Sequence, residues 1–215
     1  MAWDEAAGRV SRSFDEWLLV ERDIGAFMRL ALRIARDFYD RTWEEVSTRP
    51  SDGEGPGLPD IFEDEVEGLY GEEFEWMLLA GVVKDAVTAF EVYVEKAADE
   101  ALTWHHEPPL PRARGEESPR WGEIRAFYER LGVDLSEVRD VRRLRHLLTH
   151  QRGELRTEEQ RAAWGSDEDG LPELEVRLTN ERTASALDAL AGAARRADQE
   201  VYRVTWGGDP LPPAG

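Results

Sequence analysis

The sequence predicts an all-α protein, an antiparallel bundle of four to five helices with an acidic loop insertion. Apolar residues recur every three or four positions through most of the chain, which is the period of a helix. Proline- and glycine-rich stretches break this pattern at only a few places. With 215 residues and 41% hydrophobic content the chain can bury one core, so we expect a single domain over residues 1–206.

Two long helices are predicted in the first half of the chain. Residues 13–46 carry apolar side chains at helical spacing, and Ser13 with Glu16 matches a capping box. Residues 72–103 are apolar on most sides, so this helix should be the central and most buried one. Residues 47–70 between them are acidic and rich in glycine and proline, which predicts a mobile loop.

Acidic charge is concentrated between residues 50 and 83, where ten carboxylates occur without any lysine or arginine. A solvated connector explains this segment, since acidic loops are common. Alternatively, the acidic segment mimics a nucleic acid and folds over a basic groove elsewhere in the chain. In that case the segment would keep an enzyme inactive.

Two shorter helices should follow a loop. Ser118 is the expected cap of the third helix, and Gly132 should end it. The fourth helix should begin at a cap formed by Asp134 or Ser136 and end near Gly153.

The last part of the chain is expected to alternate between short and long elements. Residues 156–170 are compatible with a short helix or a loop, and residues 173–179 alternate polar and apolar side chains, as in a short extended segment. Residues 181–204 predict the last long helix, and residues 207–215 a disordered tail.

Composition excludes several classes of site. A formal charge of −19 argues against nucleic-acid binding by the whole surface, although a local basic site is compatible with it. The absence of cysteine excludes disulfides and cysteine-ligated metals. Neither a signal peptide nor a membrane-spanning stretch is recognisable, so we expect a cytoplasmic protein without membrane contact.

Residues 139–152 form the exception to the acidic composition. They hold five arginines, two histidines and one aspartate, a local charge of +4 without the histidines. His146 and His150 are four residues apart and share one helical face. Arg145 and His150 are five apart, about 140° around the axis, yet both can border one groove.

This combination of side chains suits the metal-free cleavage of RNA. A base must remove the 2′-hydroxyl proton, an acid must protonate the leaving 5′-oxygen, and a cation must stabilise the charge on the phosphorus. Histidine suits the first two roles, and the planar guanidinium of arginine matches phosphate oxygens. One histidine could alternate between the two roles, whereas a symmetric dimer would supply two at once.

The hexapeptide "RHLLTH", from Arg145 to His150, resembles the Arg-X4–6-His motif of the HEPN superfamily. "AFEVYVEK" in the second long helix is also similar to the corresponding HEPN helix. The resemblance covers roughly residues 10–205, although only the short motif is specific. It implies an all-α bundle and a metal-independent endoribonuclease that dimerises so that two motifs meet in one cleft.

By this resemblance Arg145 and His150 take the motif's arginine and histidine, and His146 its polar position. His150 would be the general base or acid, Arg145 the phosphate clamp and His146 a positioning group. Glu91 would face the cleft and orient Arg145. The family works in toxin–antitoxin, phage-defence and CRISPR-associated systems, which implies an RNA substrate, a homodimer and an antitoxin or defence partner. No cofactor or metal is expected.

The flanking arginines 142, 143 and 152 are the candidates for holding the RNA backbone, although a solvated face explains Arg142 and Arg143 equally well. A catalytically inactive HEPN-like adaptor is the alternative function, because some members only bind nucleotides or partners.

The other titratable groups are explained by structural roles or by solvent exposure. His146 and His150 have the spacing of a zinc pair, but the neighbouring arginines would repel the ion. His105 and His106 are expected at an exposed helix end. Lys84 and Glu91 would form a buried ion pair more readily than a catalytic pair.

Overall fold

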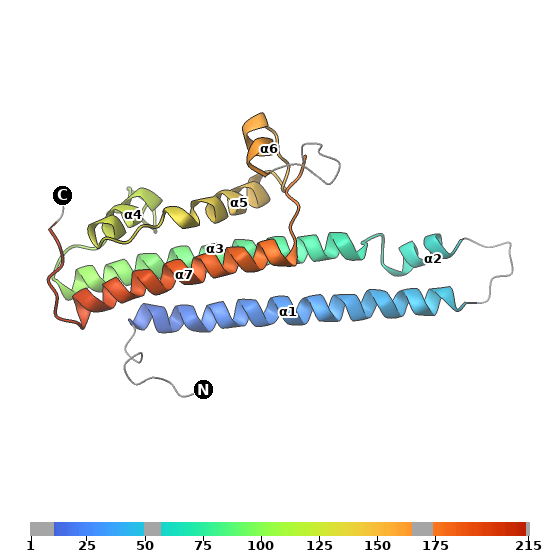
Figure 1. Ribbon diagram of the computed structural model, residues 1–215, viewed down its shortest axis with the longest axis horizontal. Coiled ribbons are helices and arrows are strands. Elements are labelled where there is room, and N and C mark those ends of the chain that lie inside the picture. Colours follow the sequence, from blue (N-terminus) through green and yellow to red (C-terminus); the bar gives the residue numbers. More distant parts are fainter. Residues whose placement is uncertain (1–10, 50–56, 165–173, 214–215) are drawn as a thin grey trace.

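The computed structural model describes residues 11–49, 57–164 and 174–213, and this part of the chain is helical (Figure 1). Among these residues the only β-pairing is an isolated bridge between Glu154 and Glu175, so residues 174–179 form no strand. The all-α prediction is therefore confirmed. The elements in order are α1 (Arg12–Ser47), α2 (Leu58–Glu65), α3 (Gly71–Trp104), α4 (Trp121–Arg130), the 3-10 turn η1 (Ser136–Val138), α5 (Arg139–His150), α6 (Glu158–Trp164) and α7 (Asn180–Thr205).

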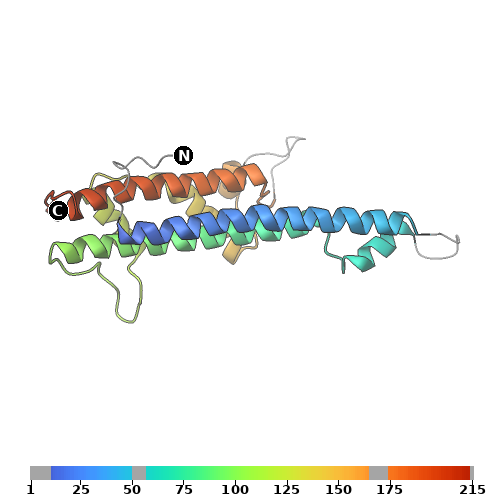
Figure 2. The same ribbon diagram turned by 90° about the horizontal axis from the view of Figure 1, so that it is seen from below.

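The helices form three layers, with α3 and α7 side by side in the middle (Figures 1 and 2). Helix α1 covers one side of this pair, and α4, η1 and α5 cover the other (Figure 1). Helices α1 and α5 run antiparallel to α3, as expected, but α7 runs parallel to it (Figure 1). The prediction of an antiparallel bundle is wrong for this pair, because the α4–α6 connection returns the chain to the starting end of α3.

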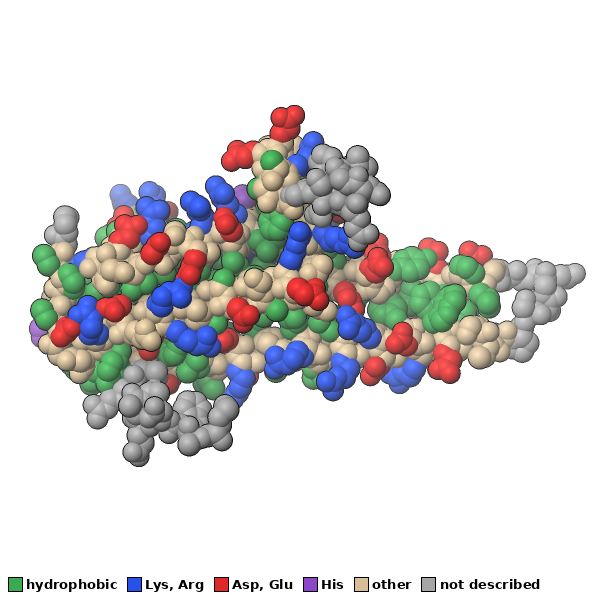
Figure 3. All heavy atoms as spheres, viewed as in Figure 1, with side chains coloured by type: hydrophobic (Ala, Val, Ile, Leu, Met, Phe, Trp, Pro, Cys, Tyr) green, Lys and Arg blue, Asp and Glu red, His purple; other side chains and the backbone are tan. Residues whose placement is uncertain are grey.

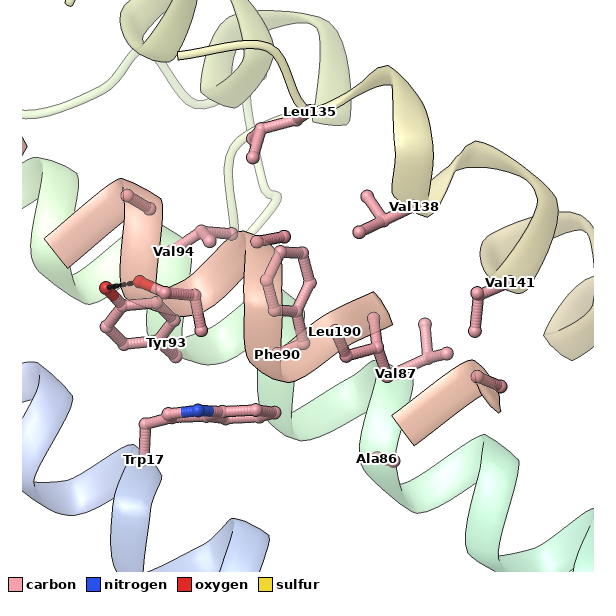
Figure 4. Packing of buried hydrophobic residues seen from close by; sticks show 14 of the residues in the cluster. Trp17, Ala86, Val87, Phe90, Tyr93, Val94, Leu135, Val138, Val141 and Leu190 are labelled. Atoms are coloured by element: carbon pink, nitrogen blue, oxygen red, sulfur yellow. Dashed lines mark hydrogen bonds between the residues drawn. The ribbon is translucent and has the colours of Figure 1, made fainter. Parts of the chain in front are cut away.

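Helix α3 is the central element, as predicted, with thirteen buried residues. Alanines on the facing sides of α3 and α7, such as Ala97 and Ala194, are fully buried and let the two backbones come close. The Tyr93 hydroxyl donates to the Ala194 carbonyl oxygen at 3.1 Å and links α3 to α7 (Figure 4). Trp17 of α1 packs edge-on against Phe90 from the other side (Figure 4).

The predicted mobile loop over residues 47–70 contains helix α2. Gly57 precedes it and Asp60 accepts a hydrogen bond from the Gly57 N–H at 3.1 Å. Phe62 packs edge-on against Trp43 of α1, and this apolar contact folds the acidic segment back on α1. Residues 50–56 of the predicted loop lie outside the described residues.

The predicted disordered tail is docked up to residue 213. Leu211 packs against the core, and the Arg130 Nε donates to the Pro212 carbonyl oxygen. Arg130 also forms a bidentate pair with Glu107, at 2.8 and 3.0 Å. This contact lowers the pKa of Glu107, mainly through the hydrogen bond from Arg130. The final two residues are outside the described part.

Candidate nucleic-acid interface

Helix α5, which carries the basic segment, is fixed at both ends. Asp134 accepts hydrogen bonds from the Ser136 N–H and hydroxyl, both at 2.7 Å, which start the η1 turn and lower the pKa of Asp134. These bonds stabilise the turn before η1, and α5 follows η1 without a break. The predicted cap by Asp134 or Ser136 is wrong, because Val138 takes the N-cap position of α5 and no side chain caps it. At the other end the Gly153 N–H donates to the Leu147 carbonyl oxygen at 3.2 Å, with Gly153 in the left-handed region at φ 85°.

The buried side of α5 consists of Val141, Leu144, Leu147 and Leu148. Because these positions repeat every three or four residues, the charged residues are forced onto the remaining surface. Arg139, Arg143, His146 and His150 share the outer face of the helix. Arg142 and Arg145 lie on the side that borders α3.

Glu91 of α3 holds these two arginines. Its Oε1 accepts from the Arg142 Nε at 2.7 Å, and its Oε2 lies 3.8 Å from the Arg145 Nη1. The Arg142 guanidinium also lies over the Trp121 ring, 3.9 Å from its centre. Glu91 is thus beside Arg145, where the family resemblance placed it. The expected Glu91–Lys84 pair does not form, because seven residues of helix separate them by about 10 Å.

A groove of about 610 Å³ lies between α5 and α6. Its polar lining holds four arginines, one histidine and two glutamates, so its net charge is positive in a chain of charge −19. Figure 3 shows basic side chains (Lys and Arg, blue) along this edge of the molecule and a histidine (purple) beside α6. The lining residues are Glu91, Arg139, Arg142, Arg143, Arg145, His146, Leu147, Thr157, Glu159, Gln160, Ala163 and Trp164.

The predicted site residues divide into two groups. Arg142, Arg143, Arg145 and His146 line the groove together with Glu91. His150 and Arg152 are exposed but do not line it. The His150 ring nevertheless lies against the His146 ring, with 4.5 Å between ring centres. Arg152 follows the helix at φ 52°, in the turn that redirects the chain toward α6.

Helix α6 forms the second wall of the groove. The sequence analysis did not include this helix in the site. Thr157 and Gln160 cap one another, with the Gln160 N–H donating to the Thr157 Oγ1 at 3.1 Å and the Thr157 N–H to the Gln160 Oε1 at 3.0 Å. The Arg161 Nε donates to the Leu155 carbonyl oxygen at 3.0 Å and holds α6 near the end of α5. The Thr-X-X-Gln capping pattern was a readable signal for this helix.

The remaining histidines belong to a helix end. His105 is the C-cap of α3, and its Nε2 lies 2.7 Å from the Val204 carbonyl oxygen. His106 follows in the left-handed region at φ 58°. Within the described ranges no three histidine, aspartate or glutamate side chains gather in a way that could hold a metal ion.

The chain matches no family model, and no curated protein or solved structure matches it. Among the helices of the described part, none combines the length and the apolar character that crossing a membrane requires.

Proposed function

We propose that the protein is a metal-independent endoribonuclease of HEPN type that acts as a toxin or an antiviral-defence effector. The observation that carries the proposal is the groove between α5 and α6, where four arginines and His146 gather on a chain of charge −19. A concave basic site is suited to a phosphate backbone, while the acidic remainder of the surface repels nucleic acid. RNA would therefore be held at this groove alone.

Arg145 is the proposed clamp for the scissile phosphate and for the charge that develops on it. Its contact with Glu91 at 3.8 Å is loose, and 37% of its side chain is exposed, so its donors can reach a ligand. Arg142 is held more firmly by Glu91 and Trp121, which suits a fixed positive wall better than a flexible phosphate contact. Arg139 and Arg143, both about two-thirds exposed, are the proposed backbone contacts.

We assign proton transfer to His146 instead of His150, the general base or acid expected from the sequence, because His146 lines the groove beside Arg145 and His150 does not. In-line displacement requires the base and the acid on opposite sides of the phosphorus. The His146 and His150 rings lie 4.5 Å apart on one helix face, too close to enclose a phosphate between them. The second proton-transfer group must come from water or, in the HEPN-type arrangement, from the His150 of a second copy.

The alternative is an inactive HEPN-like binding module that pairs with an antitoxin or another defence protein. Its support is the engagement of Arg142 and Arg145 by Glu91, which neutralises part of the basic groove. This alternative predicts RNA binding without turnover, or no RNA binding at all.

The test compares RNA cleavage by the wild type and by Arg145→Ala, His146→Ala and His150→Ala variants in the presence of EDTA. Loss of cleavage in Arg145→Ala and His146→Ala, by about 100-fold or more, is expected for a clamp and a proton-transfer group. Arg33→Ala on the exposed side of α1 and His106→Ala are the matched controls and should cleave at the wild-type rate. Equal rates for all variants would refute the site, and a wild type that binds RNA without cleaving it would favour the binding module.

A further inference from the structure

The two walls of the groove between α5 and α6 differ in chemistry. The arginines and the histidine of its lining all belong to α5. Helix α6, which projects from the end of α5 in Figure 1, provides the opposite side. We call this side the α6 wall, and it consists of Thr157, Glu159, Gln160, Ala163 and Trp164. A phosphate is attracted to α5 and repelled by the carboxylate on the α6 wall, so the α6 wall suits the base of a nucleotide.

Trp164 offers an aromatic surface on the α6 wall. It lines the groove and is only partly buried against the core. The Arg182 guanidinium lies 5.9 Å from the centre of the Trp164 ring, a looser contact than the 3.9 Å between Arg142 and Trp121. Base stacking on an aromatic side chain requires an unpaired base, because the bases of a duplex stack on one another. The Trp164 ring therefore favours a single strand.

Glu159 supplies a hydrogen-bond acceptor near Trp164. Its side chain is exposed, and it has no hydrogen-bond or ion-pair partner within the ranges that the structure describes. The helix rises by about 7.5 Å from Glu159 to Trp164, a length that a stacked purine and one hydrogen bond can span. An ionised carboxylate only accepts hydrogen bonds, so it selects a base edge that carries donors.

We propose that the α6 wall binds one unpaired guanine of the RNA, with the base stacked on Trp164 and its N1–H and 2-amino group donating to Glu159. This inference rests on the proposed RNA-cleaving function and adds a base preference to it. Guanine alone presents two adjacent donors on its Watson–Crick edge. Adenine and cytosine present one donor beside an acceptor nitrogen, and uracil presents one donor between two carbonyl oxygens. In a duplex the same edge is already paired.

Fluorescence anisotropy tests the base preference separately from cleavage. The probes are labelled uridine oligonucleotides with one central guanosine, inosine or adenosine, and a 2′-fluoro group at every position prevents 2′-hydroxyl attack. The wild type should bind the guanosine probe about tenfold more tightly than the adenosine probe, and the inosine probe, which lacks the 2-amino group, with intermediate affinity. Equal affinities for guanosine and adenosine, or equally tight binding after a complementary strand is added, overturn the proposal.

Glu159→Gln and Glu158→Gln form a matched pair of variants. Both residues are exposed on α6, but Glu158 does not line the groove. Each variant removes one negative charge, so an effect of net charge alone would appear in both. Glu159→Gln should reduce the preference for guanosine over adenosine to about onefold, whereas Glu158→Gln should keep it at about tenfold. An unchanged preference in Glu159→Gln overturns the role of Glu159.

Trp164→Ala and Trp164→Phe test the stacking surface. The alanine variant should bind the guanosine probe about tenfold or more weakly, and phenylalanine should retain most of the affinity because it keeps an aromatic ring. Trp164 also packs against the core, so circular dichroism checks that both variants fold. Wild-type affinity in a folded Trp164→Ala variant overturns the stacking. A wild type that cleaves RNA but binds all probes equally refutes the base preference alone, and one that binds no RNA refutes the nuclease proposal as well.

Discussion

Replacement of Glu91 by Gln is expected to separate the structural role of this residue from its electrostatic one. Glutamine has the same shape and can still accept the hydrogen bond that the Arg142 Nε now makes at 2.7 Å. It removes the negative charge between Arg142 and Arg145, which then face each other without a counter-ion. The variant therefore perturbs the α3–α5 contact without creating a cavity.

The expected loss in the free energy of unfolding depends on how exposed the Glu91, Arg142 and Arg145 side chains are. A hydrogen bond to a charged partner contributes about 1.5–3 kcal/mol when it is buried. The side chains of Glu91, Arg142 and Arg145 are 23%, 27% and 37% exposed, so solvent screens part of this contribution. We expect the free energy of unfolding to fall by about 1–2 kcal/mol, measured by urea denaturation with linear extrapolation.

RNA affinity should change in the opposite direction. Removing one negative charge about 7 Å from a bound phosphate is worth about 0.6 kcal/mol at the dielectric constant of water, or about threefold in affinity. Glu95→Gln is the matched control, because it removes the same charge from a residue that pairs with Arg112 outside the groove. If Glu91→Gln keeps the wild-type free energy of unfolding and binds RNA no more tightly than Glu95→Gln, Glu91 does not hold the arginines of the groove.

Three further predictions follow from single contacts. Gly153→Ala should lower the free energy of unfolding by about 1–3 kcal/mol, since Gly153 has a φ of 85° and an added Cβ would lie 2.9 Å from the Trp76 ring; an unchanged urea midpoint would contradict this. Burial raises the pKa of Asp198, so the folded state keeps a proton that the unfolded chain releases, and stability should fall as the pH rises from about 4 through the folded-state pKa. Asp198→Asn keeps the acceptor for the Ser11 N–H and should reduce the dependence of the urea midpoint on pH. An unchanged pH dependence would show that other groups cause it. Binding of single-stranded RNA should weaken with salt, with a log–log slope of about −2 to −3 for three to four phosphate contacts, and a slope near zero would exclude the basic groove.

The long helices were predictable because their apolar periodicity extends over many turns. The predicted ranges for α1, α3 and α7 differ from the observed bounds by one residue at each end. Helix α2 was missed because acid, glycine and proline dominated its composition. Its signal was nevertheless present, since Leu58, Ile61 and Phe62 have the spacing of one helical face.

The basic segment was identified from the sequence, because a +4 segment is conspicuous in an acidic chain. Glu91 was expected beside it only through the family resemblance. The distribution of residues within the site could not be predicted. Whether His146 or His150 lines the groove depends on where α6 lies, and α6 is positioned by the contact from Arg161 to the Leu155 carbonyl oxygen. The stacking of Arg142 on Trp121 likewise joins two helices whose packing no local pattern specifies.

The most direct test of the central claim is end-group analysis of RNA incubated with the wild-type protein in EDTA. The account predicts cleavage to a 2′,3′-cyclic phosphate and a 5′-hydroxyl, and no cleavage at a nucleotide whose 2′-hydroxyl is replaced by hydrogen. RNA that stays intact under all conditions, or cleavage that persists at the 2′-deoxy position, would contradict it.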